Sequence, residues 1–182
     1  KSYRQELSNL KIDSGHFIKR GGPIAISPRG IAMESNSTKA DQQTDLPLWL
    51  EVGGDFDLRA TFQDFRHAEV GDGALEMLAH LPSDAQKIRV SRHRWDNIEQ
   101  KLRTRFSSMT NGGQATQRAN DHWLANESTS GTFRMVRIGT TVHYMFAEND
   151  STNFRLLSTD KVGRGPLNAG GITLTAYSKK GG

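Results

Sequence analysis

Cationic side chains are concentrated in one short stretch of the sequence. Residues 87–105 contain seven lysines and arginines against two acidic residues, a net charge of +5, whereas the whole chain carries a formal charge of +4. Arginine binds carboxylate, sulfate and phosphate groups through paired hydrogen bonds, and a tryptophan such as Trp95 can stack on a sugar ring. The stretch therefore predicts a surface for an anionic chain. The alternative is a solvated face whose charges prevent strands from associating edge to edge.

The remaining residue types that could act in catalysis or metal binding mainly exclude kinds of site. The chain has no cysteine, which rules out thiol catalysis, zinc-thiolate sites and iron-sulfur clusters. Its six histidines are dispersed, without the close pair that a zinc site on one helix or strand needs. One predicted turn contains side-chain oxygens of the kind that bind calcium, from Glu148, Asp150 and Asn153. The same residue types are also common in turns without a metal ion. We expect no metal and no cofactor.

Short strands must position these residues. Apolar side chains recur at every second position, in runs separated by turn-forming residues, and no window has a sustained helical stripe. Two long loops are expected, at 36–47 and 107–130. This pattern favours an all-β fold, a two-sheet antiparallel β-sandwich. The predicted strands are 15–18, 24–27, 30–35, 48–52, 55–62, 74–80, 87–93, 98–106, 131–138, 141–148, 154–159 and 171–178.

Length and composition predict one domain over residues 1–182. Of these residues 35% are hydrophobic, and a chain of this size can bury about 70% of its unfolded surface, so it needs no disulfide or metal. No apolar run approaches the roughly 18 residues of a membrane span, so membrane insertion is not expected. Because the chain begins at Lys1 rather than methionine, we expect it to be a fragment of a longer protein.

The cationic stretch is predicted to form a hairpin with a defined register. Ile88 and Val90 must share the buried face with apolar residues of the next strand, which requires even-numbered residues to pair with even-numbered ones. A three-residue connection at 95–97, or a β-bulge, satisfies this condition. Odd-numbered side chains then face water and form a basic surface. The ligand-binding residues predicted on it are Arg89, His93, Trp95, Lys101, Arg103 and Arg105.

Four segments in the second half carry a resemblance to known proteins. They are GTFRMVRIG at 131–139, YMFAE at 144–148, FRLL at 154–157 and ITLTAY at 172–177. Together they resemble concanavalin A-like lectin and glucanase domains, and more closely the jelly-roll domain of a bacterial family of unknown function found in large exported proteins. The resemblance implies two antiparallel sheets packed face to face, one of them with a concave side that often holds carbohydrate. It also implies export to the cell envelope or beyond, as part of a longer chain.

The acids that a glucanase needs are not evident. Glucanases of this superfamily place alternating carboxylates on one strand, one to attack the sugar and another to protonate the leaving oxygen. The nearest substitutes here are Asp55 with Asp57, at a strand entrance, and Glu69 with Asp72. We name no catalytic residue, and the balance of the sequence is against an enzyme.

We therefore predict a non-catalytic binding module for carbohydrate, with an anionic polysaccharide as a candidate ligand. One alternative is a glycoside hydrolase or lyase with non-standard acids, and another is a structural or protein-interaction domain. Nucleic acid is not expected as a partner, because the cations are not interleaved with several stacking aromatic residues. The expected partners are a polysaccharide and the remaining domains of the longer chain.

Overall fold

The computed structural model describes residues 22, 24–27, 30–33, 35, 42–48, 52–66, 72–81, 86–95, 103–111, 118–162, 165 and 171–179. Within these residues there are twelve strands and no helix. The strands are β1 (Ile24–Ser27), β2 (Gly30–Met33), β3 (Gln42–Leu48), β4 (Phe56–Phe62), β5 (Asp72–Leu81), β6 (Gln86–Trp95), β7 (Arg103–Asn111), β8 (Arg118–Ala125), β9 (Gly131–Ile138), β10 (Thr141–Glu148), β11 (Arg155–Lys161) and β12 (Ile172–Lys179).

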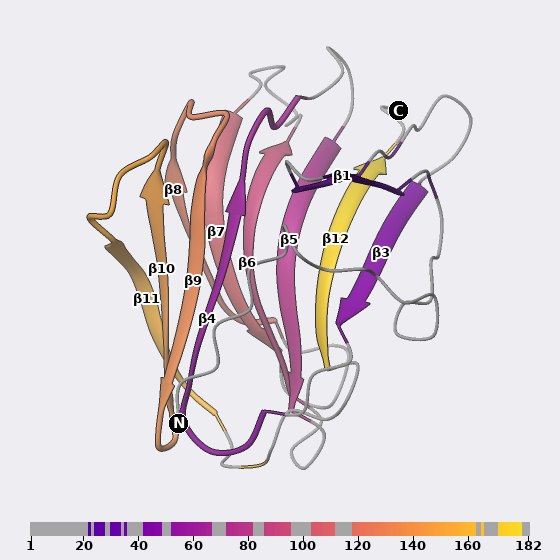
Figure 1. The fold of residues 1–182 in the computed structure, drawn as a ribbon. Helices are drawn as coiled ribbons and strands as arrows, with labels where there is room; N and C mark the ends of the chain where they lie inside the picture. Colours follow the sequence, from indigo (N-terminus) through magenta and orange to yellow (C-terminus); the bar gives the residue numbers. More distant parts are fainter. Residues whose placement is uncertain are drawn as a thin grey trace.

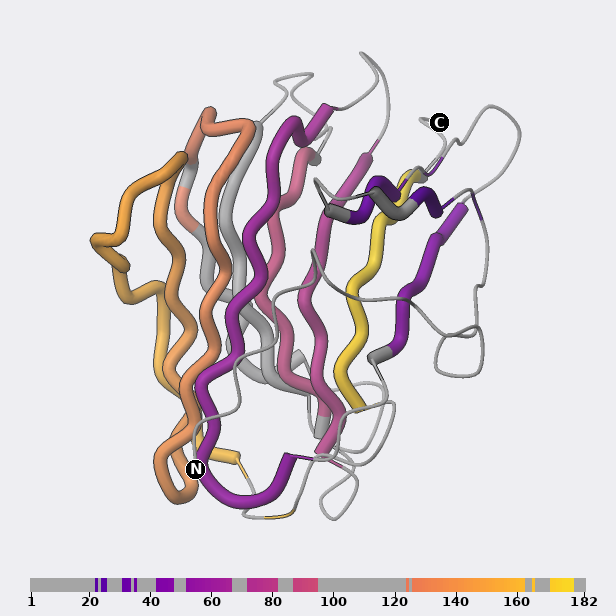
Figure 2. The backbone as a smooth tube through the Cα atoms, in the orientation of Figure 1, coloured from indigo at the N-terminus to yellow at the C-terminus, as the bar shows by residue number. Residues whose placement is uncertain are grey.

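The strands form two layered sheets and a small hairpin, all with antiparallel pairing. The larger sheet has the order β3-β12-β5-β6-β7-β8, the smaller has the order β11-β10-β9-β4, and β1 pairs with β2. In Figure 1 the four-stranded sheet stands in front of the larger sheet, and the tube in Figure 2 follows the same two layers. The predicted all-β, two-sheet antiparallel sandwich is confirmed.

The hydrophobic core lies between the two sheets. In β4, Phe56 and Phe62 are buried while Asp57, Arg59 and Thr61 are exposed, because successive side chains of a strand point to opposite faces. The same alternation along the other strands gives each sheet one inner and one outer face. Core residues with no measurable exposure include Ala79, Leu81, Ile88, Val90, Met135, Val142, Tyr144 and Phe146.

The hairpin of β9 and β10 has the predicted bounds, 131–138 and 141–148. Its two-residue turn contains Gly139, whose φ of 59° is readily available to glycine. This hairpin forms the two central strands of the four-stranded sheet, since β4 pairs with β9 and β11 pairs with β10.

The two predicted long loops are wrong, because each contains a strand. β3 begins at Gln42, inside the predicted loop 36–47, and ends at Leu48, where the predicted strand 48–52 begins. β8 lies within 107–130. Both are edge strands of the six-stranded sheet. Edge strands tolerate polar residues and a proline such as Pro47, so their sequences resemble loops. The strand predicted at 15–18 lies outside the described residues.

The predicted pairing parity of the cationic hairpin is confirmed, and its turn is wrong. Even-numbered residues of β6 pair with even-numbered residues of β7, for example Arg92 with Phe106. However, Trp95 pairs with Arg103, so the connection spans 96–102 rather than 95–97, and β7 begins five residues later than expected. The parity rule allows several registers that differ by two residues, and apolar spacing alone did not distinguish them.

Candidate functional site

The two faces of β6 separate the cationic stretch into inner and outer residues. Ile88, Val90 and Arg92 point inward and have no measurable exposure. On the outer face Lys87 is exposed, while Arg89 and His93 are half-buried. Ser91, also on this face, was expected to face water and is instead fully buried. It is short, and its register partner on β5 is the longer Glu76.

The predicted ligand-binding residues lie on two neighbouring strands. The register places Arg105 opposite His93 and Arg103 opposite Trp95, so the structure brings these four positions and Arg89 together on β6 and β7. For positions 95, 103 and 105 the structure describes the backbone. Lys101 lies outside the described residues.

An acidic residue that the sequence analysis did not single out neutralises Arg89. The Arg89 Nη1 atom donates a hydrogen bond of 2.8 Å to Glu76 Oε1 from the adjacent strand β5. The two side chains are 24% and 13% exposed, so most of this ion pair is removed from water. Burial raises the pKa of the Glu76 carboxyl, and the Arg89 guanidinium opposes that shift.

A second carboxylate belongs to the same face. Thr175 of β12 is the register partner of both Glu76 on β5 and Asp45 on β3. Its hydroxyl donates to Asp45 Oδ1 at 2.7 Å, and Gln43 Nε2 donates to both oxygens of Asp45 at 2.9 Å. The Asp45 charge also raises the pKa of Glu76, so the two acids interact electrostatically. Since two strand spacings separate them, their Cα atoms are about 10 Å apart.

These contacts define the outer polar row, which consists of Asp45, Thr175, Glu76 and Arg89 on four consecutive strands. Sequence reasoning missed it for two reasons. Asp45 lies in a segment predicted to be a loop, and Glu76 lies in a predicted strand, 74–80, that is apolar apart from Glu76 and His80. The available signal was the position of Glu76 on the polar side of the predicted strand 74–80, but its partners depend on the order of the strands.

Of the carboxylates considered from the sequence, Asp55 and Asp57 have structural partners, and Glu69 lies outside the described residues. Asp57 lies on the outer face of the four-stranded sheet and accepts two hydrogen bonds from Arg134 and two from Arg59. The Arg134 and Arg59 guanidiniums lower the pKa of Asp57 to about 2, against the effect of burial. Asp55 accepts a 2.7 Å hydrogen bond from the backbone NH of Gly139. A carboxyl that stays ionised and doubly paired is poorly suited to donate a proton.

Glu148, one of the residues considered for calcium, uses its oxygens in local hydrogen bonds. Glu148 Oε1 accepts from Arg155 Nη1 at 3.1 Å, and the Glu148 carbonyl accepts from the NH of Ser151. Ser151 Oγ in turn accepts from the NH of Asn153 at 3.1 Å. Turn chemistry therefore accounts for Glu148 and for the backbone NH of Asn153. Among the described residues, no three histidine, aspartate or glutamate side chains form a group that could hold a metal ion.

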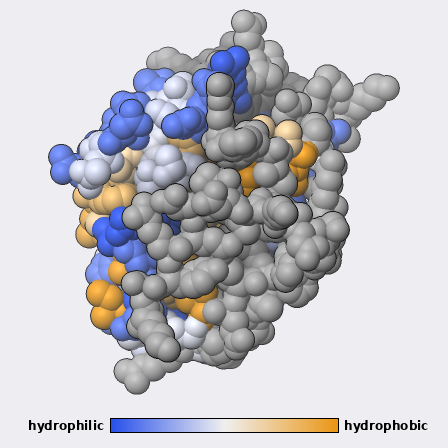
Figure 3. Space-filling view, in the orientation of Figure 1, coloured by the Kyte–Doolittle hydropathy of each residue, from blue (hydrophilic) through white to orange (hydrophobic). Residues whose placement is uncertain are grey.

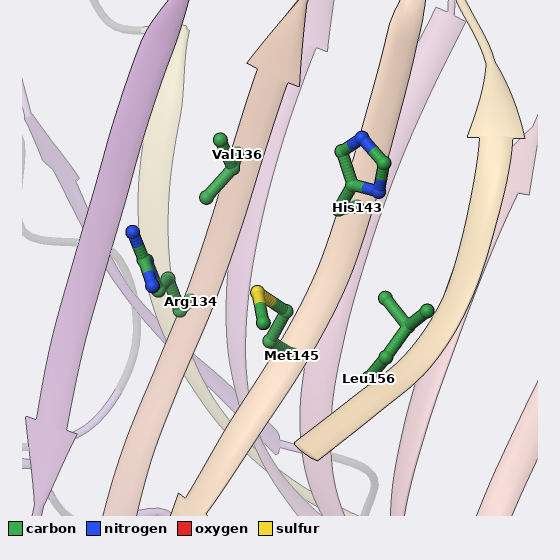
Figure 4. Close-up of a pocket in the computed structure, with 5 residues that line it drawn as sticks. All are labelled: Arg134, Val136, His143, Met145 and Leu156. Atoms are coloured by element: carbon green, nitrogen blue, oxygen red, sulfur yellow. The ribbon is translucent and has the colours of Figure 1, made fainter. Parts of the chain in front are cut away.

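A shallow hollow of ≈ 290 Å³ lies away from the cationic hairpin. It sits on the outer face of the four-stranded sheet, where side chains of β9, β10 and β11 point to the same side (Figure 4). Its lining residues are Arg134, Val136, His143, Met145 and Leu156. The molecule therefore has two distinct outer faces. The six-stranded sheet has the outer polar row, the four-stranded sheet has the hollow, and neither feature takes part in the packing between the sheets.

Comparison with known proteins supports the fold. The family model described as "Protein of unknown function (DUF1583) C domain" matches residues 1–182. A similar solved structure is the exoplasmic/lumenal domain of VIP36 in its Ca²⁺/Man2-bound form, with a TM-score of 0.63 and 10% sequence identity over 96% of this chain and 79% of that one. The similarity confirms the concanavalin A-like jelly-roll fold. No curated protein matches the sequence. In the described part of the chain, no helix has the length and hydrophobicity needed to cross a membrane.

Proposed function

The chain belongs to the DUF1583 C-domain family of unknown function, and from its lectin-type fold we propose that it is a non-catalytic carbohydrate-binding module. The proposed ligand lies across the outer face of the six-stranded sheet. We further propose that the domain acts in an exported protein, joined to other domains. The similar VIP36 domain is exoplasmic or lumenal and was solved with Ca²⁺ and Man2, which is consistent with both proposals.

The outer polar row is the observation that carries this proposal. Sugar hydroxyls both donate and accept hydrogen bonds, and the row offers carboxylate acceptors at Asp45 and Glu76 beside the guanidinium donors of Arg89. These groups are held by hydrogen bonds on rigid strands, which limits the entropy lost when a ligand binds. The surface is thus already ordered before any ligand arrives.

The charges along this face suggest how a ligand is oriented. Asp45 and Glu76 lie on β3 and β5, whereas Lys87, Arg89 and His93 lie on β6. An acidic polysaccharide would therefore place its carboxylate or sulfate groups over β6 and β7 and neutral hydroxyls over β12 and β5. Of the predicted ligand residues, Arg89 and His93 lie on the cationic strand β6, and we propose that Trp95, Arg103, Arg105 and Lys101 extend this cationic side.

Affinity gel electrophoresis tests the proposal. The whole chain is run through gels containing polygalacturonate, chondroitin sulfate or neutral xyloglucan. We expect retardation in an anionic gel that decreases with added salt, because exposed charges are screened. Lys87→Ala and Arg89→Ala should each weaken binding about three- to tenfold, the value of one or two charge-assisted contacts.

Two controls separate binding from folding. Arg155→Ala removes an arginine that also pairs with a glutamate, at 3.1 Å, but on the other sheet, so glycan binding should not change. Lys87 is exposed, so its variant keeps the Arg89–Glu76 pair and the fold. Passage through all three gels without retardation, or an equal loss in Arg155→Ala, would contradict the proposal.

One observation favours hydrolysis as a second candidate function. Burial raises the pKa of the Glu76 carboxyl, and a second carboxyl, Asp45, lies two strands away on the same face; a glycosidase uses two carboxyl groups on one side of the substrate. The same incubations distinguish the two functions. New reducing ends that disappear in Glu76→Gln would assign catalysis to this pair, whereas intact polysaccharide supports a binding module.

A further inference from the structure

The outer face of the four-stranded sheet has a regular arrangement of side chains. Register pairs place them in rows that cross β4, β9, β10 and β11. The first row is Arg59, Arg134, Met145 and Leu156, the second is Asp57, Val136, His143 and Thr159, and the third contains Ile138, Thr141 and Lys161. We call this surface, which is the side of the four-stranded sheet that faces away from the six-stranded sheet, the back face.

The back face has an apolar centre open to solvent. In the described part of the chain, the exposed large hydrophobic residues are Leu156 and Ile138, at 59% and 60%. Between them Val136 and Met145 line the ≈ 290 Å³ hollow, in which the labelled side chains point to one side (Figure 4). In Figure 3, hydrophobic and hydrophilic surfaces adjoin at the left edge, where Figure 1 places β10 and β11. An apolar patch bordered by polar groups is typical of an interaction surface.

The charges around this centre are mostly positive and held in place. The rows contain three cations, Arg59, Arg134 and Lys161, against one carboxylate, Asp57. Both guanidiniums donate to Asp57 and also lie over the Phe154 ring, with Cζ atoms 5.6 and 5.1 Å from its centroid. Lys161 Nζ donates to Thr141 Oγ1 at 3.0 Å. The face thus keeps a net charge of +2 after internal pairing.

This charge decides among possible occupants. Two copies of the chain that met through this face would bring like charges together, which disfavours a symmetric dimer. We propose that the back face docks an acidic segment of a partner protein, which inserts one apolar side chain into the hollow and places its carboxylates beside the cations. The surface lies on the sheet opposite to the proposed glycan face, so the two functions are independent.

A peptide titration followed by methyl NMR tests the proposal. The probe is a capped hexapeptide with a central leucine and phenylalanine flanked by two glutamates on each side, added to the whole chain. We expect a saturable shift of the Met145 methyl resonance, because that group lines the hollow. A peptide of the same length with lysines in place of the glutamates should leave the resonance unchanged.

Matched variants locate the binding site. Leu156→Asp should weaken binding about tenfold, because it removes an apolar anchor and adds a repelling charge. Lys87→Asp places an aspartate on the outer face of the other sheet and should bind the peptide normally. Both positions are exposed, so both variants should keep the melting temperature of the parent protein.

Several outcomes would overturn the proposal. They are an unchanged Met145 resonance, an equal response to the lysine peptide, and an equal loss in Lys87→Asp. Binding to phosphatidylglycerol vesicles without binding to the peptide would indicate a lipid surface instead. Concentration-dependent dimerisation that Leu156→Asp abolishes would indicate a second copy. None of these results bears on glycan binding, which Leu156→Asp should leave intact.

Discussion

Two buried arginines hold loops against the ends of the sandwich. Arg92 has no measurable exposure, and its guanidinium donates to the carbonyls of Ser128 at 2.9 Å and Asn126 at 2.6 Å. Burial lowers the pKa of Arg92 to about 10, so it remains charged at neutral pH. Arg137 is 1% exposed and donates to the carbonyls of Gly54 and Gly165. Backbone carbonyls rather than carboxylates thus supply much of the compensation for burying these charges.

Arg137→Lys is expected to lower the free energy of unfolding by about 2 kcal/mol. The planar guanidinium of Arg137 donates hydrogen bonds to two loops, and its Cζ atom lies 4.8 Å from the centroid of the Phe56 ring. A lysine ammonium group cannot make both sets of contacts. Urea denaturation measures the change. Arg66→Lys is the control, because Arg66 is 82% exposed and its pair with Asp64 contributes little. Equal stability of both variants would show that Arg137 acts as a simple charge.

The lowered pKa of Asp57 predicts how the free energy of unfolding depends on pH. Its folded pKa of about 2 lies below the ordinary value of 3.8, so its contribution is complete above pH 3.8 and is lost as the pH falls towards 2. Asp57 is 37% exposed, so screening limits the contribution to about 1 kcal/mol. The deficit of Asp57→Asn in urea unfolding should therefore be constant from pH 7 to 5 and shrink below pH 4. Asp64→Asn, 78% exposed, should show no deficit, and a deficit of Asp57→Asn that persists unchanged at pH 2 would contradict this assignment.

At the scale of the strands, the β9–β10 hairpin depends on a close backbone approach. Gly131 begins β9 opposite Glu148, and a Cβ atom there would overlap the carbonyl oxygen of Ala147 and lie 3.3 Å from the Phe62 ring. Both neighbours are fixed, one by the backbone and the other by the core. The position thus requires glycine for space, whereas Gly139 in the turn is required for its positive φ.

Gly131→Ala is expected to destabilise the fold by about 2 kcal/mol or more, through overpacking against backbone. Thermal unfolding measures the loss. Gly53→Ala provides the comparison, since a Cβ at Gly53 has nothing within 4 Å and should change stability by no more than about 0.5 kcal/mol. If both variants unfold alike, the close approach at Gly131 is not a constraint on the hairpin.

At the scale of the molecule, the sandwich exposes two faces with different chemistry. The six-stranded sheet has the outer polar row and the cationic strands, and the four-stranded sheet has a largely apolar hollow, lined in part by Arg134, on a face with a net positive charge. The core between them isolates one face from the other. A binding module that recognises a glycan with one sheet and a partner with the other is compatible with this layout, and the variants proposed above address each face separately.

Much of the fold could be predicted because strand formation is local. Alternation and turn residues located β4, β9 and β10, and the parity of apolar residues placed Ile88 and Val90 inside and Arg89 outside. The edge strands β3 and β8 escaped prediction because an edge position does not demand an apolar pattern.

The outer polar row, in contrast, exists only in the assembled sheet. Asp45, Thr175 and the Glu76–Arg89 pair come from distant parts of the sequence and become neighbours because β12 inserts between β3 and β5. The pleat of each strand determines which way a side chain points, and it can be read from sequence. Glu76 and Arg89 meet across two consecutive strands, 13 residues apart. The position of β12 between β3 and β5 is decided by packing of the whole chain, so the link from Thr175 to Asp45 follows from the tertiary structure alone.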